Sequence, residues 1–302
     1  MFHINEDELP DRKKVFLYFT YGKIFGDLQD YEKSFFYYQK GNSLKDKMQK
    51  FDFKNENKLL PMLKKQFSTI KLNNVIVNNE ILLKKPNPIF IVGMPRSGTS
   101  LIDQILSKHK DIKALGELEY LGNEINNLDL FSTNFSKEKA NLLNINYYKN
   151  LNNENVLTKY FTDKTPLNFR WIGYIVHSFP NAKIIHIQRD AQATCWSNFK
   201  SNFSGRANDF SNNLENTVKY FVNYKKIMSF YNDFFKHKIH NISYENLVND
   251  FENSVKKMIH YLELKWDDNC LNFDKGDRFV STISFAQVKR NLFHNSSSEW
   301  KN

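Results

Sequence analysis

The stretch PIFIVGMPRSGTS, residues 88–100, constrains the fold more than any other part of the sequence. It predicts a short buried strand at 89–92, a loop bounded by Gly93 and Gly98, and a helix that begins at Thr99 or one residue later. Strand, loop and helix N-terminus in this order form an anion-binding site, because backbone N–H groups point at the ligand. In the nucleoside-triphosphate form of the loop a lysine follows the second glycine. Thr99 stands there instead, so we expect a different phosphate ligand.

From this loop onward, apolar strand patterns alternate with helical patterns, which predicts an α/β fold with a parallel sheet and crossover helices. Ligands in such folds bind beyond the carboxyl ends of the strands. The predicted strands are 89–92, 158–162, 183–188 and 238–243. The predicted helices are 100–107, 137–149, 169–178, 191–201, 214–235 and 252–262. Polar residues follow every predicted strand, at 95–100, 163–165, 189–190 and 244–245.

The first 70 residues have a different pattern, because apolar side chains in 12–67 recur at helical spacing. Within them, YFTYGKIFGDLQDYEKSFFYYQKGN resembles one tetratricopeptide repeat, with Gly22, Phe25 and Ser34 at small and aromatic positions. One repeat cannot bury its own apolar face. We therefore expect this hairpin to pack on the α/β domain or to be the last unit of a lost array. The predicted domains are a helical region, 1–70, and the α/β domain, 71–302.

Charge and composition narrow the classes of ligand and compartment. The net charge of +10 and pI near 9.3 suit a polyanion. No basic stripe with interleaved aromatics is visible, so we predict no nucleic-acid partner. The absence of an 18-residue apolar run or a signal-peptide core predicts no membrane span. Cys195 and Cys270 have no metal or redox spacing, which favours a reducing, cytoplasmic location.

The loop itself carries groups suited to an oxyanion. Arg96 supplies a cation, Ser97 and Thr99 supply hydroxyls, and Gly98 lets the backbone approach closely. We see no aspartate after a hydrophobic strand where a Mg²⁺ ligand would be expected, so no metal is predicted. These features point to a diphosphate-like group rather than a triphosphate.

Further candidates lie after the other strands. Arg189, with Ser197 eight residues later, is a reasonable pair for a second phosphate. Glu117 could be a general base for an incoming hydroxyl, with Glu119 as its rival. Lys164 could neutralise charge that develops on a leaving group. The alternative for each is an ordinary surface charge.

The combination of PRSGTS with this arginine–serine pair resembles the sulfotransferases that use 3′-phosphoadenosine-5′-phosphosulfate (PAPS). It is similar in particular to bacterial tetratricopeptide-repeat sulfotransferases and to tyrosylprotein sulfotransferases, from about residue 12 to the end. The resemblance implies a P-loop-type parallel sheet flanked by helices, the sulfotransferase fold. It also implies that the loop binds a 5′-phosphosulfate, which has no β- and γ-phosphates for a lysine to bridge.

The family's roles transfer to matching positions. The resemblance implies that PAPS is bound by Arg96, Ser97, Gly98, Thr99, Ser100, Arg189, Ser197, Tyr244 and Ser284. It implies that catalysis by in-line transfer, without a metal, uses Glu117, Arg96, Lys164 and Ser284. Glu117 would remove the proton of the acceptor hydroxyl, and the other three would stabilise the departing phosphate.

The sequence also departs from the family pattern. Lys200, Ser201 and Asn202 stand where a second arginine is expected, and Glu299 replaces a lysine just before Trp300. The family continues beyond this tryptophan, so we expect the domain to be short at its C-terminal end. The acceptor is left open between protein tyrosine or another peptide hydroxyl, a glycan, a lipid and a small phenol, and a homodimer is left open as the oligomeric state.

Two other classes of function compete with this interpretation. A P-loop nucleotide kinase is disfavoured by the missing loop lysine, and a non-catalytic nucleotide-binding scaffold with a peptide-binding hairpin is the alternative outside enzymes. His109, His177 and His186 are alternative bases. We expect His109 to pack at a helix end and His186 to be a core strand residue.

Overall fold

The computed structural model describes residues 6–68, 85–274 and 300. The chain forms two compact units, which we treat separately. The hairpin unit comprises Met1–Glu56, Ala191–Asn223 and Asn295–Asn302. The sheet unit comprises Asn57–Asp190 and Tyr224–His294. The predicted division of the chain at residue 70 stays a prediction.

The sheet unit is built on five parallel strands, as the alternating pattern predicted. The strands are β1 (Asn87–Val92), β2 (Ile112–Ala114), β3 (Tyr160–Asp163), β4 (Lys183–Gln188) and β5 (Ile239–Ser243). Their order is β2-β3-β1-β4-β5. After β1 the chain forms the edge strand β2 and then β3, which lies between β2 and β1. It then crosses to the other side of β1, where it forms β4 and the second edge strand β5. The carboxyl end of β1 lies where the strand order switches, which is the usual ligand position in such sheets.

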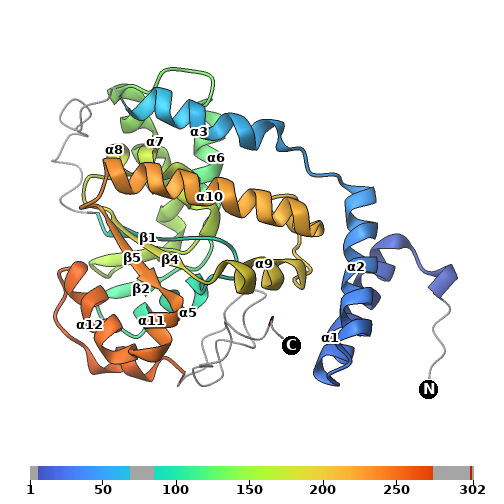
Figure 1. Ribbon diagram of the computed structural model, residues 1–302. Helices are drawn as coiled ribbons and strands as arrows, with labels where there is room; N and C mark the ends of the chain where they lie inside the picture. Colours follow the sequence, from blue (N-terminus) through green and yellow to red (C-terminus); the bar gives the residue numbers. More distant parts are fainter. Residues whose placement is uncertain (1–5, 69–84, 275–299, 301–302) are drawn as a thin grey trace. The chain divides into compact units, whose positions relative to one another are not determined.

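Helices flank this sheet (Figure 1). One side carries α5 (Thr99–Leu106), α11 (Tyr244–Asn249) and α12 (Phe251–Tyr261). The other side carries α6 (Tyr120–Asn127), α7 (Lys137–Leu151), α8 (Ile172–Ser178) and the parts of α3 (Phe53–Phe67) and α10 (Leu214–Phe234) that belong to the sheet unit, from Asn57 and from Tyr224 onward. Short 3₁₀ segments are η1 (Glu6–Glu8), η3 (Asn152–Glu154), η4 (Pro166–Trp171), η5 (Asp209–Asn212) and η6 (Asp268–Asn272).

Burial on both faces explains the uninterrupted apolar sequence of β1. Ile89 and Ile91 join the core formed with α5 and α12. Phe90 points to the opposite face, where its ring centroid lies 5.7 Å from that of Phe179 and 5.9 Å from that of Tyr147. The strand is therefore fixed by packing on two sides, and the loop after it starts from a rigid support.

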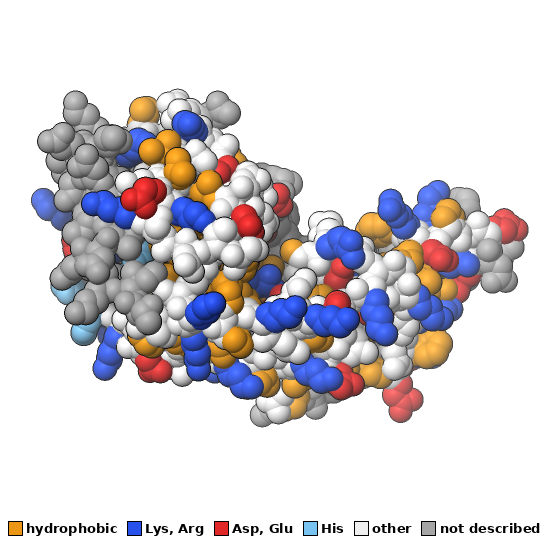
Figure 2. Space-filling model, turned by 90° about the horizontal axis from the view of Figure 1, so that it is seen from above, with side chains coloured by type: hydrophobic (Ala, Val, Ile, Leu, Met, Phe, Trp, Pro, Cys, Tyr) orange, Lys and Arg blue, Asp and Glu red, His pale blue; other side chains and the backbone are white. Residues whose placement is uncertain are grey.

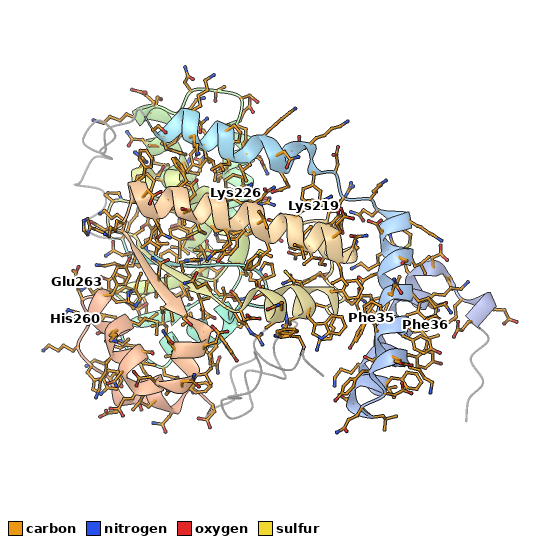
Figure 3. All side chains as sticks on the ribbon, in the orientation of Figure 1. Phe35, Phe36, Lys219, Lys226, His260 and Glu263 are labelled. Carbon is orange, nitrogen blue, oxygen red and sulfur yellow. The ribbon has the colours of Figure 1, made fainter. Side chains whose placement is uncertain are left out.

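The hairpin unit contains α1 (Asp11–Asp27), α2 (Tyr31–Met48) and α9 (Ala191–Phe199). The Ser34 hydroxyl donates to the Gly22 carbonyl at 2.7 Å, so the two small residues singled out in the sequence do meet at the α1–α2 contact. Phe35 and Phe36 lie side by side on α2 (Figure 3), and the Phe35 ring stacks 6.2 Å from that of Trp196 on α9. The assignment of this pair to the tetratricopeptide class stays a prediction.

The surface of α3 and α10 can be inspected in Figure 2, where basic side chains are scattered among apolar and acidic ones. Lys64, Lys226 and Asp233 are all exposed there. Among the described residues, no helix is long and apolar enough to cross a membrane.

Candidate functional site

The glycine-bounded loop is held tightly between neighbouring elements. A Cβ on Gly93 would lie 2.4 Å from the Ile187 carbonyl oxygen, so only glycine fits beside β4. Gly98 precedes α5 with a φ of 111°, and a Cβ there would lie 2.7 Å from the ring of Tyr244. Both glycines bring backbone close to other elements, as an anion-binding loop requires.

A buried hydroxyl in this loop lacks an internal partner. Ser97 is 1% exposed, and within the described structure its Oγ atom has no hydrogen-bond partner. Leaving such a group unsatisfied costs about 1–3 kcal/mol. Thr99 and Ser100 are also buried at the start of α5. These donors fit the phosphate end of a nucleotide, because an oxyanion would satisfy both the hydroxyl and the helix N-terminus.

Two arginines add positive charge beside the loop. Nη1 of Arg189 donates to the Arg96 carbonyl at 3.3 Å, and its guanidinium lies 4.8 Å above the centroid of the Tyr244 ring. Burial, together with the neighbouring Arg189, lowers the pKa of Arg96 to about 10. Arg96 is still charged at neutral pH, and two cations this close favour a ligand with more than one negative charge.

The strand register places the candidate catalytic residues at the same edge of the sheet. β3 pairs with β1, and the Gly93 N–H donates to the Pro166 carbonyl at 3.1 Å, which joins the loop to the segment after β3. There the fully buried ammonium of Lys164 forms an ion pair with the half-exposed carboxylate of Glu117. The Lys164 N–H donates to the Gly116 carbonyl at 2.7 Å. The structure thus brings Glu117 and Lys164 together beside the loop.

β3, the neighbour of β1, ends at Asp163, one residue beyond the strand end predicted from the sequence. The expectation that no aspartate is placed here as a Mg²⁺ ligand stays a prediction. Asp163 is fully buried, its carboxylate accepts from Tyr147, Thr165 and Asn168, and burial raises its pKa to about 7. Its oxygens are therefore committed to internal donors. No group of three or more metal-ligating side chains occurs in the described part of the chain.

A second carboxylate at this edge was not assigned a role from the sequence. Glu245 accepts from the Asp190 N–H and from the Ser243 hydroxyl, each at 3.0 Å. It thereby links the ends of β4 and β5, which carry Arg189 and Tyr244. Tyr244 itself begins α11 rather than ending a strand. The signal available in the sequence was the polar pair directly after β5.

For other predicted site residues, a position at this edge stays a prediction. Ser284 and Glu299 lie outside the described residues. Ser197 belongs to the hairpin unit, so its pairing with Arg189 stays a prediction. Glu119, the rival of Glu117, is exposed and precedes the first residue of α6.

The three histidines occupy structural positions. His186 is buried between Tyr224 and Asn241, at 2.5 and 2.7 Å, and burial lowers its pKa to about 4. His177 contacts the Gly173 carbonyl at 2.7 Å, and burial lowers its pKa as well. His109 contacts the Lys265 carbonyl at 2.9 Å beyond the end of α5. These contacts agree with packing roles.

A groove of about 540 Å³ lies elsewhere on the sheet unit, between α3 and α10. It is lined by Leu60, Lys64, Ser68, Lys226, Ser229, Phe230, Asp233 and Phe234. None of the site residues predicted from the sequence lines it. Lys226, labelled in Figure 3, projects from α10 at this groove.

The fold and the loop define an α/β protein with a glycine-bounded loop at the switch point of its sheet, and with a Glu117–Lys164 ion pair after the neighbouring strand β3. Residues 88–268 match the model of the sulfotransferase family. The chain belongs to that family.

Two individual relatives match two thirds or more of this chain. An uncharacterized protein of Aquifex aeolicus is 26% identical over 317 residues, which cover 99% of this chain and 41% of that protein. A protein-tyrosine sulfotransferase of Drosophila melanogaster is 24% identical over 219 residues, covering 67% of this chain and 43% of that protein. The chain thus spans about two fifths of the length of these two relatives.

Among solved structures, the sulfotransferase domain of the Synechococcus PCC 7002 olefin synthase has the same fold. The TM-score is 0.53 at 20% identity, over 72% of this chain and 89% of that domain. The similarity confirms the predicted sulfotransferase-type sheet with flanking helices.

Proposed function

We propose that the protein transfers the sulfuryl group of PAPS to an acceptor hydroxyl at the carboxyl edge of its sheet. The observation that carries this proposal is the Glu117–Lys164 ion pair beside the glycine-bounded loop. A carboxylate next to a site for an anion repels that ligand. Its presence is understandable if it serves the other reactant as a base.

The residues around the loop fit the phosphate part of PAPS. Arg96 provides a charged guanidinium, Ser97 a buried hydroxyl without an internal partner, and α5 its N-terminal N–H groups. Arg189, stacked on Tyr244, provides a second cation for a second phosphate. When bound, PAPS supplies a sulfuryl group on a phosphate leaving group. Ser197 and Ser284 complete the proposed set for cofactor binding.

The two residues of the ion pair would have different roles in the reaction. Glu117 is half exposed, so a hydroxyl can approach its carboxylate, which would accept the proton. Lys164 is fully buried and would stabilise negative charge on the departing phosphate, as would Arg96 and Ser284. Held in line, the two reactants would gain much of the acceleration from orientation alone.

Several finer properties are part of the proposal. A peptide tyrosine is the first acceptor to test, since the named relatives include protein-tyrosine sulfotransferases. Glycans, lipids and small phenols are the alternatives. We further propose a tetratricopeptide-type role for the α1–α2 hairpin, a cytoplasmic location and a homodimer as hypotheses to be tested independently.

Calorimetric titration with 3′-phosphoadenosine-5′-phosphate tests the cofactor site. We expect micromolar binding by the wild type and a loss of at least about 30-fold in Arg96→Ala, because two or more charge-assisted hydrogen bonds are removed. Lys256→Ala, on the exposed side of α12, is a control that also removes one positive charge and should bind normally.

A parallel titration with Mg-ATP separates the alternatives. Tight Mg-ATP binding without binding of the bisphosphate would favour a kinase. Binding of the bisphosphate without transfer to any of the acceptor classes would favour the nucleotide-binding scaffold.

A further inference from the structure

Two short segments that are far apart in the sequence contact each other at the candidate site. One is the base loop, residues 115–118, which carries Glu117. The other is the β3 tail, residues 162–165, which carries Lys164. Both lie in the sheet unit. Their contacts decide where the Glu117 carboxylate sits relative to the Lys164 ammonium.

The backbone of the base loop is engaged at three residues. The Leu115 N–H donates to the Thr162 hydroxyl oxygen at 3.3 Å, and the Gly116 carbonyl accepts from the Lys164 N–H at 2.7 Å. The Leu118 carbonyl lies 2.9 Å from the Thr165 hydroxyl. The backbone N–H of Leu118 donates to the Asp163 carboxylate. Glu117, the remaining residue, is bound through its side chain to Lys164.

The backbone conformation of the base loop depends on a glycine. Gly116 adopts a φ of 75°, in the left-handed region that glycine tolerates best, immediately before Glu117. The half-exposed Glu117 side chain is joined to the rest of the site through its ion pair. The hydrogen bonds at Gly116 and Leu118 therefore flank the carboxylate on both sides and limit its movement.

Asp163 is the centre of this support. Its carboxylate accepts from Tyr147 on α7 at 3.0 Å, from Thr165 at 2.7 Å and from Asn168 at 3.4 Å, in addition to Leu118. Three of these donors come from elements outside the base loop. The side chain thereby ties the base loop to α7 and to the 3₁₀ segment η4.

Resting on the proposed function, we propose that Asp163 and Thr165 are positioning residues that hold Glu117 in place opposite Lys164. Neither is placed against PAPS or acceptor. They act through the backbone of Leu118, so their removal should loosen the base loop and slow proton removal while leaving the phosphate-binding loop intact.

Hydrogen exchange measured by NMR or mass spectrometry tests the positioning without requiring an acceptor. Thr165→Val is nearly isosteric and removes only the hydroxyl, and Thr165→Ser restores it. We expect amides 116–118 to exchange about tenfold faster in Thr165→Val and at nearly the wild-type rate in Thr165→Ser. Amides of β4 should be unchanged in both. Equal exchange in all three proteins, or failure of serine to restore protection, would overturn the proposal.

Kinetics with PAPS and a tyrosine-containing peptide provide the second measurement. Thr165→Val should lower kcat by about tenfold with the KM for PAPS within about threefold, and Thr165→Ser should recover both. Asp163→Asn should show the same split, and Thr165→Val decides the outcome if this variant does not fold. A rise in the KM for PAPS with unchanged kcat would contradict a positioning role.

The two proposals can fail separately. If the wild type does not bind the bisphosphate, the proposed function fails, but the exchange of amides 116–118 still shows whether the base loop depends on Thr165. If the bisphosphate binds and exchange is insensitive to Thr165, the proposed function stands and only the positioning role is lost.

Discussion

At the scale of single residues, the site combines one buried and one accessible charge. Lys164 is fully buried, whereas the side chain of Glu117 is 48% exposed. A buried ammonium needs its counter-ion, since an unpaired buried charge is strongly destabilising. Glu117 therefore serves stability as well as the proposed chemistry, and variants must be measured for both.

Glu117→Gln should lower the rate of sulfuryl transfer by about 10² to 10⁴-fold, because the amide cannot accept the hydroxyl proton. Affinity for the bisphosphate should stay within about threefold, and urea unfolding should report a lower free energy of unfolding. Glu119→Gln is the matched control and should behave as the wild type. If Glu119→Gln loses activity and Glu117→Gln does not, the two glutamates exchange roles.

Gly98→Ala should abolish detectable bisphosphate binding and lower the free energy of unfolding by about 2 kcal/mol or more. The added methyl would meet the Tyr244 ring at 2.7 Å, on a backbone with φ of 111°. Calorimetry and urea unfolding measure the two effects. Gly205→Ala provides the comparison, because Gly205 has a φ of 76° and nothing within 4 Å. Equal losses in both variants would show that backbone strain alone, rather than the contact with α11, is responsible.

At the scale of elements, the sequence predicted what periodicity and length make visible. The strands at β1 and β4 and the helices at α7 and α10 agree with the structure within two residues. The three-residue β2 and the short helices α6 and α11 were missed, because such segments are too short to show a period. The region expected to be one helix at 169–178 begins as 3₁₀ structure at Pro166 and becomes α-helical only at Ile172.

In the candidate site, too, features formed by adjacent residues could be predicted from the sequence and contacts between distant residues could not. The glycine-bounded loop was visible because its residues are adjacent in sequence. The support of Glu117 by Asp163 and Thr165 joins residues more than forty positions apart, and only the register of β2, β3 and β1 brings them together. A pattern within one segment carries no information on such a contact.

The α1–α2 hairpin allows a prediction about one element pair. Gly22→Ala should lower the free energy of unfolding by about 1–3 kcal/mol, because its Cβ would lie 2.8 Å from the Tyr38 ring. Gly26→Ala, one turn later on the same helix, would meet only the Ser34 hydroxyl at 3.1 Å. There the gain in helix propensity, about 0.5–1 kcal/mol, should offset most of the contact. Urea unfolding followed by circular dichroism compares the two variants, and similar losses would contradict tight packing at Gly22.

At the scale of the whole molecule, buried titratable groups set the response of stability to pH. The pKa of His186 is lowered to about 4, so the unfolded chain takes up this proton before the native state does. The contribution of neutral His186 to the free energy of unfolding is fully present above about pH 6.5 and is lost as the pH falls toward 4. The pKa of Asp163 is raised to about 7, and its contribution has the opposite sign, being lost as the pH rises from about 4 through 7.

Because the two groups oppose each other, the difference between wild type and His186→Gln isolates the histidine. Between pH 6.5 and 4 the wild type should lose about 3 kcal/mol more in free energy of unfolding than the variant does. Urea unfolding at half-unit pH steps measures this. Parallel curves for the two proteins would mean that His186 has the same pKa in the native and unfolded states.

The position of β1 in the sheet also has a consequence for how the protein is made. Of the strands in the described residues, β1 is the first to leave the ribosome; within this sheet its partners are β3 and β4, and β2 emerges before either. Translation proceeds at about 5–20 residues per second. For several seconds the nascent chain therefore presents a strand that is apolar from Pro88 to Val92 with both edges open, the condition under which aggregation competes with folding. Production of the intact protein should thus depend on chaperones that bind nascent chains, and slowing synthesis between β1 and β3 should lower its soluble yield.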